Sequence, residues 1–372
     1  MAPAPGRILT VNAGSSSLKL RTLDAEDRVV GSRDSGSIGD RAALREELEA
    51  VLNDGGPVEA VGHRVVHGGP DFTGPTVLDP SVEDRLDHLA DLAPLHNPPA
   101  VAAIRALDAL RPGLPGVACF DTAFHAEMPA AASTYAVPAA WSERWPLRRY
   151  GFHGLSHSHA SRRAAELLDR PLEELRIVTA HLGAGASLAA VQGGRSVETT
   201  MGFTPLEGLV MATRSGTVDP GLLLWVQRHG DWSAKEMERA LDQEAGLLAL
   251  SGRSGDMRDV LAGAEGGDER CRLAFDVYIH RLAAGVAAMA AAMAGLDAVV
   301  FTGGVGENSS RVRAAAAEAT AFLGVGLDAE ANGGNRGDGV ISPPGAPTSA
   351  LVVVAREDLE IAAQVRATLP AV

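Results

Sequence analysis

The chain has 372 residues, of which 46% are hydrophobic and 22% charged, so it is long enough for two domains that each bury a core. Its formal net charge of −14 argues against a general nucleic-acid binder, whose surface would be basic, although a few local arginines could still hold a small anion. The two cysteines, Cys119 and Cys271, belong to no C-x-x-C pair. They indicate neither a disulfide framework nor a cysteine zinc site, which is typical of the cytoplasm.

Hydrophobic periodicity predicts strands that alternate with helices. The start of the chain, up to Asn12, lacks a basic region followed by an apolar stretch, so we expect no signal peptide. In chain order we predict strands over residues 7–12, 18–23, 58–66, 114–120, 298–302 and 351–354, and helices over residues 40–53, 81–92, 99–110, 219–229, 233–245, 268–294 and 357–368. Because Asp297 interrupts the alanine-rich run that includes Leu282, we interpret this run as a buried helix rather than a membrane span.

Two stretches about half the chain apart resemble each other. RILTVNAGSSSL (residues 7–18) and RIVTAHLGAGASL (residues 176–188) share an arginine, an isoleucine, a threonine, a glycine and a final Ser-Leu. Short strand–turn patterns can recur by chance, but we favour an internal duplication, which predicts two similar α/β domains that each open with a β-hairpin. A Gly/Ser hairpin turn exposes backbone N–H groups, so two such turns facing each other could bind a polyphosphate.

The most chemically varied window is YGFHGLSH, Tyr150–His157, which follows Arg148 and Arg149. Its mixture of aromatic residues, glycines, a serine and histidines favours a functional site over a glycine-rich turn with one buried histidine. Histidines spaced by four can bind zinc from one face of a helix, as could those at positions 153 and 157 or 63 and 67. Neither window contains the glutamate of H-E-x-x-H, and the second pair lies on or just after a predicted strand, so we disfavour zinc.

Two arginines stand among apolar or glycine-rich neighbours, where a guanidinium needs an anionic partner. Arg64 lies in VGHRVVHGG and Arg214 in MATRSG, and either an anionic ligand or a salt bridge could satisfy each of them. Asp121 and Glu357 follow predicted strands, and with Asn12 they offer the hard oxygen ligands that Mg²⁺ prefers.

The segment TGGVGEN, residues 302–308, lies between a predicted strand and a predicted helix. Its glycines would let the backbone approach a phosphate or a ribose closely, although a tight turn could need glycine for its own sake. The pattern matches neither G-x-G-x-x-G nor the P-loop, so neither of these nucleotide fingerprints applies.

Longer motifs resemble a known family. NAGSSSLK (12–19), GHRVVHGG (62–69), LHNPP (95–99), FDTAFH (120–125), YGFHGLSH (150–157), MGFTPLEGLVMATRSG (201–216), SGDMRDV (254–260) and FTGGVGENS (301–309) are similar to motifs of the acetate kinases, in the same order. Propionate and butyrate kinases share much of the pattern. The resemblance implies an α/β fold of two duplicated ribonuclease H-like domains, of the sugar kinase/actin ATPase superfold, with an interdomain active-site cleft.

The resemblance also implies boundaries, partners and a reaction. The first domain is expected at residues 1–149, completed by a C-terminal helix over 358–372, and the second, with the nucleotide-binding segments, at 150–357. We expect a homodimer with no nucleic-acid or membrane partner. The implied reaction is ATP + acetate ⇌ ADP + acetyl phosphate, with Mg²⁺ or with Mn²⁺ in its place.

The motif positions carry implied roles. Asn12 and Glu357 match the metal positions, Arg64 matches the arginine that binds the carboxylate, Asp121 matches the catalytic acid/base, and His153 and Arg214 match two groups that stabilise the transition state. The acyl pocket matches Val66, Leu95, Phe152 and Pro205. The nucleotide-binding residues match Ser17, Lys19, His181, Leu182, Gly183, Ala184, Gly185, Asp256, Met257, Arg258, Gly304, Val305, Gly306, Glu307 and Asn308.

Physical chemistry and three departures refine this assignment. Acetate, with a pKa of about 4–5, is ionised at neutral pH and needs no base, so we favour an orienting role for Asp121. Ala184 and Thr217 replace a family asparagine and aspartate, and the loop around Met257 also differs, which leaves the phosphoryl donor open. The alternatives are a propionate or butyrate kinase and a non-catalytic nucleotide-binding regulator; a zinc hydrolase ranks below both.

Overall fold

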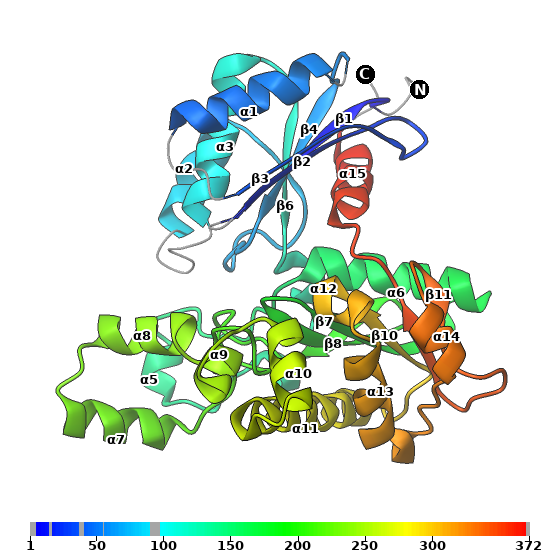
Figure 1. Cartoon of the computed structure of the whole chain (residues 1–372). Helices are drawn as coiled ribbons and strands as arrows, with labels where there is room; N and C mark the ends of the chain where they lie inside the picture. The colour runs from blue at the N-terminus through cyan, green and yellow to red at the C-terminus, as the bar shows by residue number, and fades with distance from the viewer. Residues whose placement is uncertain (1–4, 15–16, 37–40, 55, 90–96, 370–372) are drawn as a thin grey trace. The chain divides into compact units, whose positions relative to one another are not determined.

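A computed structural model describes residues 5–14, 17–36, 41–54, 56–89 and 97–369. The chain divides into two compact units, coloured along the sequence in Figure 1. Unit 1 comprises Met1–Ala126, Phe152–His159 and Arg356–Val372, and unit 2 comprises Glu127–Gly151 and Ala160–Ala355. Helix α6 (Gly154–Leu168) begins in unit 1 and continues in unit 2.

Unit 1 is built on a sheet of six strands in the order β3-β2-β1-β4-β6-β5. Strands β1, β2 and β3 are antiparallel neighbours, whereas β1, β4 and β6 run parallel. The elements are β1 (Ile8–Ala13), β2 (Ser17–Leu23), β3 (Val29–Gly36), α1 (Arg41–Asp54), β4 (Ala60–Val65), β5 (Thr76–Val77), α2 (Pro80–His88), α3 (Asn97–Leu110), β6 (Gly116–Phe120), the 3₁₀ turn η2 (Ala123–His125) and α15 (Glu357–Thr368).

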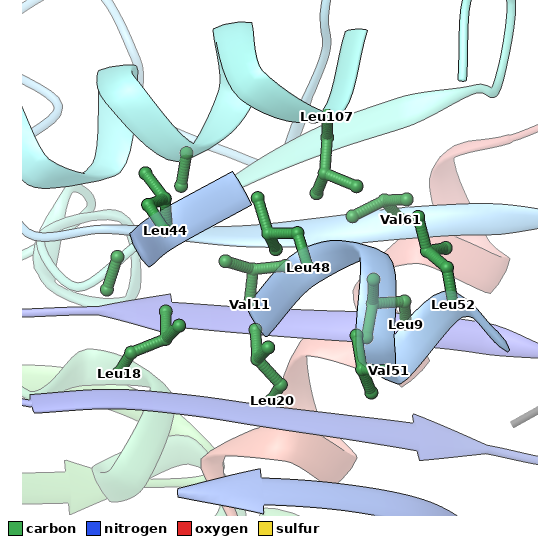
Figure 2. Close-up of a cluster of buried hydrophobic side chains, with 12 residues drawn as sticks. Leu9, Val11, Leu18, Leu20, Leu44, Leu48, Val51, Leu52, Val61 and Leu107 are labelled. Carbon is green, nitrogen blue, oxygen red and sulfur yellow. The ribbon is translucent and has the colours of Figure 1, made fainter. Parts of the chain in front are cut away.

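Helices α1 and α3 cover one face of this sheet. Figure 2 shows Leu44, Leu48 and Val51 of α1 packed against Val11 and its strand neighbours, all of them buried. The four apolar α1 residues recur at i, i+4, i+7 and i+8, the spacing that places side chains on one side of a helix. The predicted helix over 40–53 is therefore confirmed, and its buried side chains form part of one apolar cluster of the unit.

Helix α15 covers the opposite face, although residues Ala160–Ala355, which belong to unit 2, separate it in sequence from the rest of unit 1. Ile361 and Val365 pack on β4, where Gly62 leaves the room that they need, because a Cβ at that position would collide with Ile361. The helix predicted over 357–368 is confirmed, and it brings Glu357 to the edge of this sheet.

Unit 2 repeats the same topology, with the order β11-β12-β10-β7-β8-β9. Strands β7, β8 and β9 are antiparallel neighbours, whereas β7, β10 and β12 run parallel, as in unit 1. The predicted duplicated α/β fold is therefore confirmed. Its strands are β7 (Arg176–Leu182), β8 (Ala186–Gln192), β9 (Arg195–Thr199), β10 (Ala298–Thr302), β11 (Gly339–Val340) and β12 (Ser349–Val352).

Many helices belong to unit 2, and the longest, α11, packs on its sheet. Gly285 of α11 leaves space for Leu188 of β8, whose side chain a Cβ there would meet at 2.7 Å. The helices and 3₁₀ turns are α4 (Ala130–Ser133), α5 (Ala139–Ser142), η3 (Leu172–Glu174), α7 (Pro220–Gly230), α8 (Ala234–Gln243), α9 (Gly246–Ser251), α10 (Met257–Glu265), α11 (Glu269–Ala292), α12 (Gly303–Asn308), α13 (Ser310–Ala319), η4 (Ala321–Leu323) and α14 (Ala329–Gly334).

Among the described residues, α11 is the one helix long and apolar enough to cross a membrane. It instead contacts α9, α10, α13 and β8 of its own unit, as the interpretation of a buried helix requires.

The glycine-rich segment after β10, which the sequence places between a strand and a helix, itself forms the short helix α12. The turn is made at Gly303, whose φ of +78° favours glycine. A Cβ on this residue would lie 2.9 Å from Leu182 O.

Candidate active site

The carboxyl ends of β1, β4 and β6 bring three predicted site residues together in unit 1. Asn12 lies near the end of β1, Arg64 lies one residue before the end of β4, and Asp121 follows β6 directly. Because these strands are parallel neighbours, their ends meet at one edge of the sheet, which is where α/β proteins bind ligands. Glu357, the first residue of α15, completes the group.

Arg64 is the centre of this group. Its Nε and Nη2 donate to the two carboxylate oxygens of Asp121 at 3.0 and 2.6 Å. Its Nη1 donates to Asn12 Oδ1 at 3.0 Å, and Glu357 Oε2 lies 3.8 Å from Nε. Asn12 Nδ2 in turn donates to Glu357 Oε2 at 3.0 Å. Three of the five N–H groups of the guanidinium are used, which leaves two with no partner among the described residues.

Burial and the charge of the partner shift the pKa values of Arg64 and Asp121 in opposite directions. Burial alone would lower the pKa of Arg64, but the charges of Asp121 and Glu357 raise it above its ordinary value. Burial raises the pKa of the Asp121 carboxyl, Arg64 opposes that rise, and the charge of Glu357 adds to it. Since both Asp121 oxygens accept from Arg64, the geometry fits a carboxylate that fixes an arginine better than a base that faces a substrate.

The turn before α6 sits against the same edge of unit 1. His153 adopts a left-handed φ of 56°, and its backbone N–H donates to the Asp121 carboxylate. Gly154 N donates to Asp121 O at 2.9 Å, and a Cβ on this glycine would collide with that oxygen. His125 Nε2 lies 3.0 Å from Phe152 O, and burial lowers the pKa of His125 to about 4. The ring is therefore neutral at pH 7 and donates to that carbonyl.

The remaining predicted residues of unit 1 lie on β2 or after β4. Ser17 starts β2, and Lys19 lies opposite Asn12 in the antiparallel ladder with an exposed side chain. Val66 and Phe152, both predicted to line the acyl pocket, are buried, and the Phe152 ring packs edge-on against His67 at 5.3 Å. Leu95, the third predicted pocket residue, lies outside the described residues.

In unit 2 the predicted nucleotide segments gather at the ends of β7 and β10. His181 and Leu182 end β7, opposite Thr302 at the end of β10. Gly183, Ala184 and Gly185 form the hairpin turn, closed by a 2.9 Å hydrogen bond from Gly183 N to Gly185 O. The helix α12 that follows Gly303 carries the other predicted residues, Gly304, Val305, Gly306, Glu307 and Asn308.

Ala212 joins two of these segments. Its N–H donates to Ala184 O at 3.1 Å, and its carbonyl lies where a Cβ on Gly255 would meet it at 2.6 Å. Asp256 follows as the N-cap of α10, accepting from Arg258 N, while Met257 begins that helix. Glu307 Oε1 accepts from Gly303 N and from Ala355 N, each at 2.9 Å, and so fixes the start of α12.

Arg214 is anchored in the same unit. Its Nε lies 3.1 Å from Asp242 Oδ1, and its Nη1 donates to Pro205 O at 3.0 Å. Burial lowers the pKa of Arg214, and the charge of Asp242 opposes that shift. Pro205, the last predicted pocket residue, thus also acts through its carbonyl as a hydrogen-bond acceptor for this arginine.

The sequence model of the acetokinase family matches residues 39–363. The chain belongs to the acetokinase family. Among curated proteins, acetate kinase of Synechococcus sp. is 47% identical over 95% of this chain and 97% of its own length. Acetate kinase of Leifsonia xyli is also 47% identical, over 96% of this chain and 97% of its own length.

Solved structures of two similar proteins superpose on nearly the whole of this chain. Acetate kinase of Porphyromonas gingivalis superposes with a TM-score of 0.90 at 36% identity, covering 98% of this chain and 100% of its own. A propionate kinase of Francisella tularensis superposes with a TM-score of 0.89 at 34% identity, covering 96% and 98%. The likeness to the acetokinase family is therefore one of fold and sequence together.

Two residues to which the sequence alone assigns no role contact the predicted site residues. His125 lies in the motif FDTAFH, and its closeness to Asp121 in that motif is the sequence signal that points to it. Asp242, the partner of Arg214, lies on α8, and the sequence carries no local signal that connects the two.

The zinc hypothesis can be tested against the described residues. None of them forms a group of three or more histidine, cysteine, aspartate or glutamate side chains that could hold a metal ion. His157 lies on α6, where its N–H donates to His153 O at 2.9 Å and closes the first helical turn.

Proposed function

We propose that this protein transfers a phosphoryl group reversibly between ATP and acetate. Family membership and relatives that are named acetate kinases support the reaction. The observation that carries it is the Arg64 group, because a guanidinium held by Asp121 and Asn12, with two N–H groups that have no partner among the described residues, suits a small carboxylate. As ATP is the donor, we place the reaction in the cytoplasm.

Acetate attacks the γ-phosphorus as a carboxylate and needs no proton removed. The chain's task is therefore to bring two anions together in line and to place positive charge on the transferring group. We assign Arg64 to the acetate carboxylate, and Arg214 and His153 to the phosphoryl oxygens. Asp121 then acts by holding Arg64 in place rather than as a base.

Asn12 and Glu357 fit a magnesium ion. Mg²⁺ takes hard oxygen ligands, keeps several waters and needs only one or two carboxylates from the protein, which is what these side chains offer. When bound, Mg²⁺ or Mn²⁺ would neutralise phosphate charge on the nucleotide. Asn12 and Arg64 hold the Glu357 carboxylate at this sheet edge.

The nucleotide is assigned to unit 2, with the turn Gly183–Gly185, the start of α10 and the helix α12 around it. The turn's exposed N–H groups suit phosphates. Because Ala184 stands where the family has asparagine, the donor is the part of the reaction most open to variation. Activity with ATP, GTP and pyrophosphate should be compared directly.

Arg214→Ala tests the assignment. The variant should lose most acyl-phosphate formation, at least about a hundredfold in kcat, because one preorganised donor to a phosphoryl transition state is worth that much. Acetyl phosphate is trapped as the hydroxamate. Arg281→Ala, an exposed arginine in the same unit, is the matched control and should match the unsubstituted protein. Near-normal turnover of Arg214→Ala would contradict the mechanism.

The acyl preference is proposed from the apolar walls Val66, Phe152 and Pro205. A short pocket selects against each added methylene by about 1–3 kcal/mol, so propionate should be a poorer substrate but a measurable one. Comparing kcat/KM for acetate, propionate and butyrate separates acetate kinase from its sibling activities. A chain that binds ATP but forms no acyl phosphate would instead be a nucleotide-binding regulator.

We further propose a homodimer through α7. None of its described side chains is buried, and Leu222, Leu224 and Trp225 are 49%, 58% and 54% exposed. Several large exposed apolar side chains on one helix mark an interaction surface, and a two-fold axis lets the same helix of two copies meet. Leu224→Glu should halve the mass measured by light scattering, whereas Phe322→Glu, at a residue 74% exposed elsewhere in unit 2, should not. An unsubstituted protein that is monomeric would exclude this interface.

A further inference from the structure

The segment between β9 and α7 has to be held by side chains rather than by secondary structure. Residues 200–219, all described by the structure, form no helix or strand, yet they carry Pro205 and Arg214. Irregular segments of this length inside a compact unit are usually functional and need their own supports. This inference rests on the proposed function, in which Pro205 borders the acyl group and Arg214 contacts the phosphoryl group.

Three side chains brace the first part of this segment. Arg149 Nη1 donates to the carbonyls of Thr200 and Met201, each at 3.1 Å, and its Nη2 donates to Glu207 Oε1 at 2.8 Å. The other Glu207 oxygen accepts from the Tyr135 hydroxyl at 2.8 Å.

Tyr135 closes the bracing. Its hydroxyl accepts from Phe203 N at 2.8 Å while it donates to Glu207, so both of its hydrogen-bonding functions are used on one segment. Gly202 lies directly under this contact, and a Cβ there would collide with Glu207 Oε2 and the Tyr135 hydroxyl. The backbone of residues 200–203 is thus bound on both sides.

The charges of this group are partly buried and matched. The side chains of Arg149 and Glu207 are 17% and 33% exposed, and Glu198 lies 3.7 Å from the same guanidinium. Burial would lower the pKa of Arg149, but the hydrogen bond and charge of Glu207 raise it, so the group keeps its charge. Hydrogen bonds to charged groups are among the stronger ones, which makes this a firm support.

The support reaches Arg214 through the backbone. Pro205 lies between Phe203 and Glu207, both held by the network, and its carbonyl accepts from Arg214 Nη1 at 3.0 Å. Further along, Gly208 and Thr217 close the segment, with Thr217 N donating to Gly208 O at 2.9 Å and Gly208 N donating to Thr217 Oγ1 at 3.1 Å.

We propose that Tyr135, Arg149 and Glu207 are positioning residues, which hold Pro205 and Arg214 in register and thereby set both the turnover and the acyl-chain preference of the reaction. None of the three contacts substrate in this assignment. They act through the placement of the segment that they bind.

Tyr135→Phe is the test, since it removes the one hydroxyl that joins Phe203 to Glu207. With acetate, kcat should fall about tenfold, the effect of losing a hydrogen bond to a charged group. The propionate-to-acetate ratio of kcat/KM should rise about threefold as Pro205 gains freedom. KM for ATP should stay within about twofold, because the nucleotide segments keep their own supports.

Tyr278→Phe is the matched control. The Tyr278 hydroxyl is buried in the same unit but has no hydrogen-bond partner among the described residues. Its removal should leave kcat and the acyl ratio unchanged. If Tyr135→Phe behaves like Tyr278→Phe, or if it changes only the thermal stability, the positioning role is wrong.

A double-mutant cycle separates positioning from an independent contribution. The variant Arg214→Lys lacks the guanidinium nitrogen that donates to Pro205 O. When Tyr135→Phe is added to this variant, kcat should fall by less than about threefold. Multiplicative losses would overturn the proposal. Glu207→Gln keeps the shape of the side chain and should cause the same fall in kcat and the same rise in the propionate-to-acetate ratio as Tyr135→Phe. It serves as the second test should Tyr135→Phe fold poorly. Absence of acyl-phosphate formation by the unsubstituted protein would instead refute the proposed function itself.

Discussion

Asp121→Asn distinguishes an orienting carboxylate from a catalytic base. In the structure the Asp121 oxygens accept from Arg64 Nε at 3.0 Å and from Nη2 at 2.6 Å. The isosteric amide keeps one acceptor and turns a donor toward the other Arg64 nitrogen. One charge-assisted hydrogen bond is lost, worth about 2 kcal/mol.

That loss should appear in the use of acetate. Arg64 keeps Asn12 and the nearby Glu357 as partners, so it should shift rather than leave the site. If about 2 kcal/mol of its placement is lost, kcat/KM for acetate should fall about 30-fold, while KM for ATP changes little. Thermal unfolding should show a matching loss of stability, because the pair is buried.

The assay is hydroxamate trapping across about pH 6–9, with Asp34→Asn as the matched control. Asp34 also receives two hydrogen bonds from one arginine, Arg21, at 2.7 Å each, but its side chain is 61% exposed. Exposed pairs contribute little, so the control should be nearly neutral. A loss beyond about a thousandfold in Asp121→Asn, together with disappearance of the acidic limb of the pH–rate profile, would show that Asp121 is a base.

Three further outcomes follow from the same site. Gly154→Ala should cost at least tenfold in kcat, since its Cβ would displace Asp121 O; crystallography or activity matching the parent would contradict this. Glu357→Gln should raise the Mg²⁺ concentration for half-maximal activity about tenfold or more, measured by metal titration at saturating ATP, and an unchanged requirement would remove this residue from the metal site. His125 has a pKa of about 4 when folded against 6.5 in its ordinary state, so the unfolded chain binds more protons between these values and stability falls as the pH drops through them. The free energy of unfolding in urea should therefore fall between about pH 7 and about pH 4.5, and this fall should be about 2 kcal/mol smaller in His125→Gln than in the parent. An equal fall in both proteins would refute the assignment.

Local patterns predicted much of the framework. The two hairpin sequences, RILTVNAGSSSL and RIVTAHLGAGASL, correspond to β1–β2 and β7–β8, and the two sheets share one topology. The helix over 357–368 was predicted with the bounds that the structure shows. These elements follow from period and turn chemistry, which act over a few neighbouring residues.

The sequence was less informative where neighbours in space are distant in the chain. The glycines after Thr302 do not show where the turn ends, because in this segment Gly303 takes a left-handed backbone and the residues that follow are helical. The segment 200–219 shows no period, and its order depends on Tyr135 and Arg149, which lie more than fifty residues earlier.

The sequence by itself determined the family, the duplicated α/β framework and the types of residue at the proposed site, because motifs and periodicity are written in short stretches. Only the tertiary structure decided which partners those residues take. Arg64 could have met a substrate or a salt bridge, and the parallel ends of β4 and β6 bring it to Asp121, with two of its N–H groups unpaired within the part of the chain that the structure describes. Likewise, Arg214 lies in an irregular segment and Asp242 on α8, and the fold brings their charges together. A buried charge needs a partner that is near in space, and the sequence gives no sign of which distant residue that will be.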